Sequence, residues 1–190
     1  INVTGTTTNT VSVRSLVFGT PLPRTLTLTG SSTGGNTIGA ALVDAAGGGV
    51  LSITKSGDGK WILTANNTYT GNTVASAGQL LVNGTTSGQG NYTIGAGATL
   101  GGTGTIGLAA DQSITLAGTD AGHTAAMSVG SAHLTVNSGG AGKTAFGDNS
   151  VLNVSLDGNS IGLLSTQALD LGSALDAVNI TATGSQTAER

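Results

Sequence analysis

The chain has 190 residues and a formal net charge of −3, and only 8% of its residues are charged and 3% aromatic. Gly, Thr, Ser and Asn make up half of the sequence, whereas an average domain has about 25% charged residues. With six Lys and Arg in total, the sequence has no basic cluster for nucleic acid, and no apolar run of about 18 residues predicts a membrane-inserted helix.

Cysteine is absent, which excludes disulfide bridges and thiolate metal sites. Glu189 is the one glutamate, so the composition is not that of a helical bundle. A mean hydropathy of +0.20 with regularly spaced Val, Ile and Leu argues against disorder. The sequence begins at Ile1 without a signal peptide, which predicts a piece of a longer precursor whose signal or anchor lies elsewhere.

Apolar residues alternate with Thr, Ser or Asn in short segments along the chain. Successive side chains of a β-strand point to opposite faces, so this period of two predicts strands with one buried and one hydroxyl-rich face. The clearest segments are 25–29, 51–54, 113–116, 133–136 and 151–156. We expect about a dozen short strands and no long helix, because runs of Gly, Asn and Asp form turns between such segments, at 47–49, 58–59, 83–84 and 157–158.

Leucines at the centres of alternating segments recur about every 18 residues, at Leu63, Leu80, Leu100, Leu116, Leu134, Leu152 and Leu169. This period matches one coil of a β-solenoid, in which each coil stacks on the previous one at about 4.8 Å. It predicts roughly ten short coils with the leucines in one continuous interior. The alternative is a β-sandwich, which also has closely spaced strands but normally contains more aromatic and charged residues.

Residues 55–84 read KSGDGKWILTANNTYTGNTVASAGQLLVNG. This segment resembles the autotransporter-associated β-strand repeat of secreted bacterial proteins. The matching positions are Gly57, Gly59, Trp61, Leu63, Asn67, Thr68, Tyr69, Thr70, Gly71, Thr73, Ala77, Gly78 and Leu80. Ala65 stands where the motif usually has Gly, and residues 38–55 and 97–107 resemble the segments that flank such a repeat.

The resemblance covers about residues 36–107. It implies a right-handed parallel β-helix of the passenger-domain type, secreted and placed at the bacterial cell surface or in the extracellular matrix. We therefore expect one all-β solenoid domain over 1–190, with N-terminal strands over 1–35, the repeat over 36–107 and a looser continuation over 108–190. The motif residues of this family are structural, so the resemblance implies no catalytic residues.

Several features have a chemical interpretation and a structural one that we prefer. Residues 139–144 read GGAGKT, but Asn137 replaces the first Gly of a phosphate-binding loop and Thr144 replaces the Asp of a calcium-binding repeat, so a turn is expected. His123 and His133 lack nearby ligands for a metal and are expected at the surface.

Trp61 and Tyr69 fit motif positions, which favours core or rim packing over glycan binding. Sequons for glycosylation are expected by chance in this composition, at Asn2, Asn66, Asn83, Asn91, Asn153 and Asn179.

Parallel β-helices that cleave acidic polysaccharides need clustered carboxylates. The aspartates of this chain are instead spread along it, mostly beside Gly or Asn, at Asp44, Asp58, Asp111, Asp120, Asp148, Asp157, Asp170 and Asp176. We therefore expect no catalytic residues, no cofactor and no metal site, and predict that the chain is not an enzyme.

These observations predict an extracellular structural or adhesive protein, a self-associating subunit of a surface fibre or matrix. One alternative is a stalk that presents a missing binding domain, and another is a polysaccharide-acting enzyme, which would need a groove with two or more carboxylates or an Arg. Strand-like segments lie near both ends without a capping helix, so we expect head-to-tail homo-oligomers, formed by abutting coils or by insertion of residues 1–18 into the next subunit. Surface glycans are a further candidate partner; nucleic acid and membrane insertion are not expected.

Overall fold

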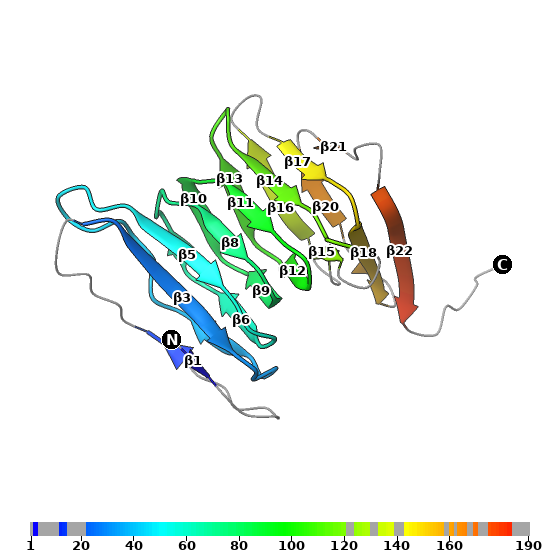
Figure 1. The fold of residues 1–190 in the computed structure, drawn as a ribbon, viewed down its shortest axis with the longest axis horizontal. Coiled ribbons are helices and arrows are strands. Elements are labelled where there is room, and N and C mark those ends of the chain that lie inside the picture. Colours follow the sequence, from blue (N-terminus) through cyan, green and yellow to red (C-terminus); the bar gives the residue numbers. More distant parts are fainter. Residues whose placement is uncertain are drawn as a thin grey trace.

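The computed structural model describes residues 2–3, 12–14, 22–120, 124–129, 133–138, 143–157, 160–161, 163–166, 169–170 and 175–183. These ranges contain strands and turns but no helix, and hence no helix able to cross a bilayer. The strands stack in three sheets along the long axis of the molecule, as the progression of colours in Figure 1 shows. This stacking of parallel strands is that of a parallel β-helix, and it excludes the β-sandwich.

A coil that has all three strands contributes one strand to each of the three sheets. The first sheet contains β1 (Asn2–Val3), β3 (Arg24–Gly30), β5 (Leu51–Lys55), β8 (Thr73–Ala75), β11 (Tyr92–Ile94), β14 (Ser113–Leu116), β17 (Lys143–Phe146) and β21 (Leu169–Asp170). The second contains β2 (Ser12–Val13), β4 (Asn36–Ile38), β6 (Lys60–Leu63), β9 (Gly78–Val82), β12 (Ala98–Gly101), β15 (Ala125–Val129), β18 (Ser150–Asp157) and β22 (Leu175–Thr183), with β19 (Ser160–Ile161) antiparallel to β18. The third contains β7 (Asn66–Asn67), β10 (Thr85–Gln89), β13 (Thr105–Leu108), β16 (His133–Ser138) and β20 (Leu163–Thr166).

The coils are longer than the leucine spacing predicts. Trp61, Leu80, Leu100, Met127 and Leu152 stack in successive coils and are 19, 20, 27 and 25 residues apart. The period of 18 is therefore wrong as a coil length, because the leucines used to derive it lie on different sheets: Leu116 is on β14 and Leu134 on β16. Longer coils give fewer of them, and within the described residues the first and second sheets each contain eight parallel strands rather than about ten.

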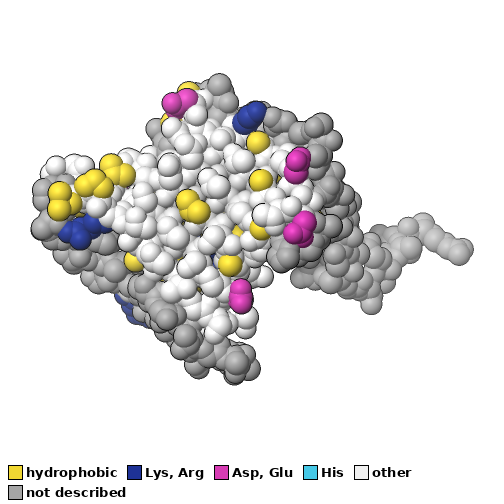
Figure 2. All heavy atoms as spheres, viewed as in Figure 1, with side chains coloured by type: hydrophobic (Ala, Val, Ile, Leu, Met, Phe, Trp, Pro, Cys, Tyr) yellow, Lys and Arg dark blue, Asp and Glu magenta, His cyan; other side chains and the backbone are white. Residues whose placement is uncertain are grey.

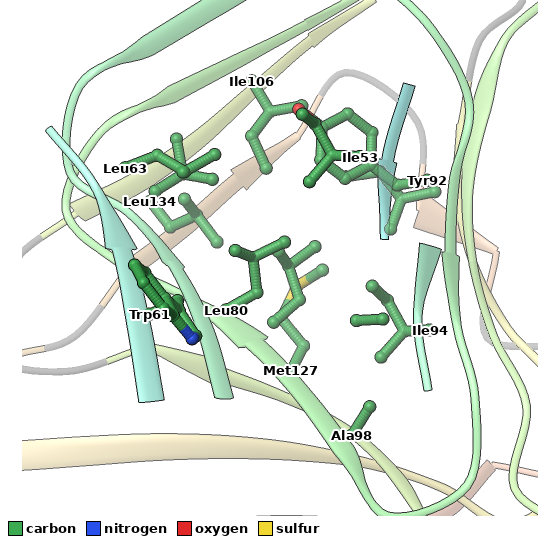
Figure 3. Packing of buried hydrophobic residues seen from close by; sticks show 14 of the residues in the cluster. Ile53, Trp61, Leu63, Leu80, Tyr92, Ile94, Ala98, Ile106, Met127 and Leu134 are labelled. Atoms are coloured by element: carbon green, nitrogen blue, oxygen red, sulfur yellow. The ribbon is translucent and has the colours of Figure 1, made fainter. Parts of the chain in front are cut away.

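The interior is one continuous stack of aliphatic side chains from all three sheets. Leu63, Leu80, Leu100, Leu116, Leu134 and Leu152 are all buried in the same cluster, which confirms the predicted interior position of these six leucines. Figure 3 shows Leu80, Ile94 and Ile106, from three different sheets, directed into this shared space. Trp61 is completely buried and Tyr69 is 3% exposed, so both aromatic motif residues pack in the core.

Glycines of the repeat lie where neighbouring coils approach most closely. Gly30, Gly57 and Gly78 follow one another at the same corner, with φ of 116°, 69° and 65°. A Cβ on Gly57 would lie 2.7 Å from the Gly30 carbonyl oxygen, and one on Gly78 would meet the Gly57 carbonyl oxygen. These positions therefore require glycine both for the left-handed backbone and for the spacing of the coils.

Buried asparagines connect coils at another corner. Asn67 is 1% exposed, and its Oδ1 accepts a hydrogen bond of 3.0 Å from the backbone N–H of Leu42 in the preceding coil. Its Nδ2 donates to the carbonyl oxygens of Ala65, at 2.9 Å, and of Thr85 in the next coil, at 3.3 Å. One side chain thereby satisfies backbone groups of three consecutive coils, which explains the asparagine of the repeat motif.

Candidate functional site

The aspartates whose side chains the structure describes all lie outside the named strands. Asp58, Asp111, Asp120 and Asp148 are exposed, and the side chains of Asp157, Asp170 and Asp176 lie outside the described residues. Nowhere among the described residues do three or more His, Cys, Asp or Glu come together as a metal site would need. His123 and the side chain of His133 also lie outside the described residues, so their surface position stays a prediction.

Asp44 lies in the loop before β5 and connects this loop to the next coil of the β-solenoid. Its Oδ1 accepts hydrogen bonds from the backbone N–H groups of Leu51, at 2.9 Å, and Thr70, at 3.1 Å, and its Oδ2 accepts one of 2.6 Å from Thr70 Oγ1. Burial opposes ionisation of this carboxyl, but the three hydrogen bonds outweigh it and lower the pKa of Asp44. A carboxylate so stabilised and so fully hydrogen-bonded is a structural group rather than a general acid.

Lys55 is an ammonium group enclosed by backbone carbonyls. It occupies an inward position of β5, between Leu28 on β3 and Ala75 on β8, and its side chain is completely buried. Its Nζ donates to the carbonyl oxygens of Ser56, Gly57 and Ala77, at 3.0, 2.6 and 2.8 Å. Burial lowers the pKa of Lys55 to about 8, although the nearby charge of Asp58 raises it. With its donors occupied and its surface covered, Lys55 ties two coils together and is closed to a ligand.

Four hydroxyl groups form a second enclosed cluster inside the core. The Tyr69 hydroxyl lies 2.8 Å from Thr73 Oγ1 and 3.3 Å from the Tyr92 hydroxyl, which donates to Thr86 Oγ1 at 2.8 Å. All four residues are buried, and burial is the main cause of the raised pKa of both tyrosines. The cluster keeps buried polar atoms satisfied and has no opening to solvent, so its function is structural.

The GGAGKT segment is only partly described. Residues 139–142 lie outside the described residues, while Lys143 and Thr144 begin β17, where Thr144 is completely buried. A buried strand position cannot present its hydroxyl to a phosphate group. The expected turn is wrong for Lys143 and Thr144, which belong to this strand, and stays a prediction for residues 139–142.

The outer surface is polar but nearly uncharged. In Figure 2 most of the visible face is backbone and uncharged polar side chains, with scattered hydrophobic side chains and a few Lys, Arg, Asp or Glu side chains between them. On the second sheet the structure contains a groove of about 280 Å³, lined by Gln79, Leu81, Asn83, Thr99, Gly102, Thr103 and Ser128. None of these seven residues is charged, so the groove lacks the carboxylates and Arg that polysaccharide cleavage would need.

Sequence reasoning did not find this groove or the enclosed Lys55. A signal was present for Lys55, which stands in the apolar phase of the alternating segment 51–55. An ionisable residue at an apolar position predicts a buried charge with partners.

Comparison with known proteins identifies the central segment. Residues 53–82 match the family described as the passenger-associated-transport-repeat. This segment of the chain is similar to a passenger repeat. The match lies within residues 36–107, where the sequence motif predicts the repeat, and it confirms that resemblance.

A curated relative carries a similar segment. The adhesin BmaC autotransporter of Brucella suis biovar 1 (strain 1330) is 48% identical over 50 residues, which are 26% of this chain and 1% of that protein. The chain thus corresponds to a very small part of that relative. No solved structure matches the chain. The passenger repeat and this relative indicate a secreted, surface-exposed bacterial protein.

Proposed function

We propose that this chain is a segment of an extracellular adhesive passenger, a β-helical rod that acts by binding and not by catalysis. The single observation that carries the proposal is the passenger repeat at residues 53–82, placed in the structure as consecutive coils of one continuous stack. The relative named as an adhesin supports the adhesive role. The dispersed aspartates and the uncharged groove support a role without catalysis.

Adhesion is tested with beads that carry the purified chain through a C-terminal tag. The beads are applied under flow to cultured epithelial cells, and beads that carry the tag alone serve as the control. We expect attachment that is saturable and is competed by free chain. Attachment equal to that of the control beads would contradict the adhesive function.

The rod also offers a route to self-association, which we include in the proposal. At its C-terminal end β22 pairs with β18, and no further strand of the described chain pairs with its other side. An open edge of this kind recruits another strand, and contact between unlike ends propagates into a filament. At the N-terminal end β1 and β2 pair with β3 and β4 of their own chain. This intramolecular pairing favours abutting coils over insertion of residues 1–18 into the next subunit.

The edge of β22 can be tested with two proline variants, Asn179→Pro and Ile180→Pro. Neighbouring residues of a strand direct their N–H groups to opposite sides, so one variant removes a bond to β18 and the other blocks the open edge. We expect one of the pair to melt like wild type but to lose its filaments in negative-stain electron microscopy. If both proline variants fold correctly and still form filaments, association through this edge is excluded. It is also excluded if the wild-type chain stays monomeric at high concentration.

A further inference from the structure

The groove on the second sheet crosses three successive coils, those of β9, β12 and β15. The outward positions of β6, β9, β12 and β15 form a row across the coils, in which Ile62, Leu81, Gly101 and Ser128 are paired in register. Gly101 has no side chain in this row, but the Ser128 carbonyl oxygen occupies the place that its Cβ would take. Gly102 follows with a φ of 126° and lines the groove together with side chains of the coils on either side.

The polar groups that line the groove are available to a ligand. Asn83 Oδ1 accepts a hydrogen bond of 3.2 Å from the Thr103 backbone N–H, which fixes the amide and leaves its Nδ2 group without an acceptor. Within the described structure, the side chains of Gln79, Thr99, Thr103 and Ser128 make no hydrogen bond at all. Leu81 supplies the apolar part of the lining, and a Cβ on Gly101 would lie 3.3 Å from Leu81 Cδ2.

This lining selects a chemical class of ligand. Hydroxyl and amide groups can donate and accept hydrogen bonds, as the hydroxyls of a sugar do, and Leu81 can contact the C–H face of a sugar ring. The lining offers no charge to pair with an ionic ligand; Lys60, the register neighbour of Gln79, lies outside it. An extended peptide would need an unpaired strand edge, but β9 and β12 each have a strand on both sides.

From these observations we infer that the groove is a binding site for a neutral carbohydrate of one or two sugar residues. A volume of about 280 Å³ is at the lower end of small-molecule sites, which suits a ligand of this size. The inference rests on the proposed adhesive function and makes it more specific, because it names the class of surface molecule that the rod recognises.

The test uses the intact 15N-labelled chain and two variants matched in chemistry. Thr99→Trp places a large ring in the groove, whereas Thr93→Trp places the same ring at the exposed centre of β11 on the first sheet. The probes are maltose, cellobiose, lactose and N-acetyllactosamine, with digalacturonate as an acidic comparison. Binding is followed through the side-chain amide resonances of Gln79 and Asn83, and circular dichroism checks that each variant is folded.

We expect at least one neutral disaccharide to shift both amides saturably with a millimolar dissociation constant, and Thr99→Trp to weaken binding by at least about tenfold while Thr93→Trp leaves it unchanged. No saturable shift with any neutral probe, binding of digalacturonate alone, or equal binding by folded Thr99→Trp would overturn the inference. The bead assay separates the two proposals. If the beads adhere but no sugar shifts the amide resonances, only the carbohydrate site is disproved. If a sugar shifts the resonances but the beads do not adhere, only the adhesive function is disproved.

Discussion

Lys55 shows how far a single residue can depart from the pattern that surrounds it. The alternation of Leu51, Ile53 and Lys55 on the inner face of β5 predicts an apolar residue at the third position. The structure accommodates a lysine because three carbonyl oxygens from adjacent coils accept hydrogen bonds from its ammonium group. Those oxygens come from turns, whose positions depend on the coil-to-coil packing, so the sequence pattern alone does not predict them.

Burial of the Lys55 ammonium group should make the free energy of unfolding depend on pH. Lys55 has a pKa of about 8 in the folded chain and an ordinary value of 10.5 when unfolded. Between these values the unfolded chain binds more protons than the folded one, so the contribution of Lys55 to stability rises with pH. We expect chemical denaturation of wild type to gain stability relative to Lys55→Met as the pH is raised from 8 to 10. A constant difference between the two proteins over this range would contradict the buried, destabilised charge.

Leu116 and Thr115 are adjacent residues of β14 that face opposite ways. Leu116 is completely buried and stacks between Ile94 and Phe146, whereas Thr115 is exposed. Leu116→Asp should destabilise the chain by at least about 3 kcal/mol, because it removes apolar packing and buries an unpaired carboxylate. Thr115→Asp should change stability by less than about 0.5 kcal/mol. Urea denaturation of both variants checks this, and similar midpoints would refute the inward register of β14.

At the scale of the strand and its turn, the sequence is most informative where apolar and polar residues alternate. The predicted strands over 25–29, 51–54, 113–116, 133–136 and 151–156 are all present, because alternation is a local property that each strand displays by itself. The turns at 58–59 and 83–84 also lie between strands as predicted. Which glycines contact the preceding coil cannot be read from such patterns, since this depends on the register of distant residues.

Two glycines with ordinary backbone angles distinguish packing from conformational freedom. A Cβ on Gly104 would overlap the carbonyl oxygen of Gly84 in the preceding coil, but a Cβ on Gly95 would lie 3.7 Å from its nearest neighbour, the Ala75 carbonyl oxygen. We expect Gly104→Ala to destabilise the chain by about 1–3 kcal/mol through overpacking. Gly95→Ala should be neutral or stabilising by up to about 1 kcal/mol, because it restricts the unfolded chain.

Thermal unfolding of the two glycine variants, followed by circular dichroism, measures this difference. Equal melting temperatures would show that the coils can separate at Gly104 without cost, contrary to the close contact with Gly84. A strongly destabilised Gly95→Ala would show instead that the backbone at Gly95 requires glycine.

For the whole molecule, the class of fold could be predicted and the length of the coil could not. The excess of Gly, Thr and Asn, the scarcity of aromatic residues and the repeat at 55–84 all indicate a solenoid. The coil length differs from 19 to 27 residues in the second sheet because turns between strands vary, so leucines from different sheets imitate a shorter regular period. The groove likewise arises only when Leu81, Thr99 and Ser128 are brought together across coils by that register.

Each coil of a solenoid contacts mainly its two neighbouring coils. Removal of one complete coil should therefore leave the strand register of the other coils intact. Residues 80–99 are such a unit: Leu100 takes the position of Leu80 opposite Trp61, and Thr105 takes the position of Thr85 opposite Asn66. Farther along, Ile114 replaces Tyr92 opposite Thr73.

We expect the chain without residues 80–99 to keep a cooperative thermal transition and a β-rich circular dichroism spectrum. Its maximum dimension in small-angle X-ray scattering should fall by about 4.8 Å, the spacing of one coil. Deletion of residues 80–89 is the control, because it removes most of β9 and all of β10, joins Gln79 to Gly90 just before β11 and shifts the strands that follow out of register. That variant should be unfolded or aggregated. If both deletions unfold the chain, the coils depend on contacts beyond their neighbours; if both fold equally well, the register across the three sheets is wrong.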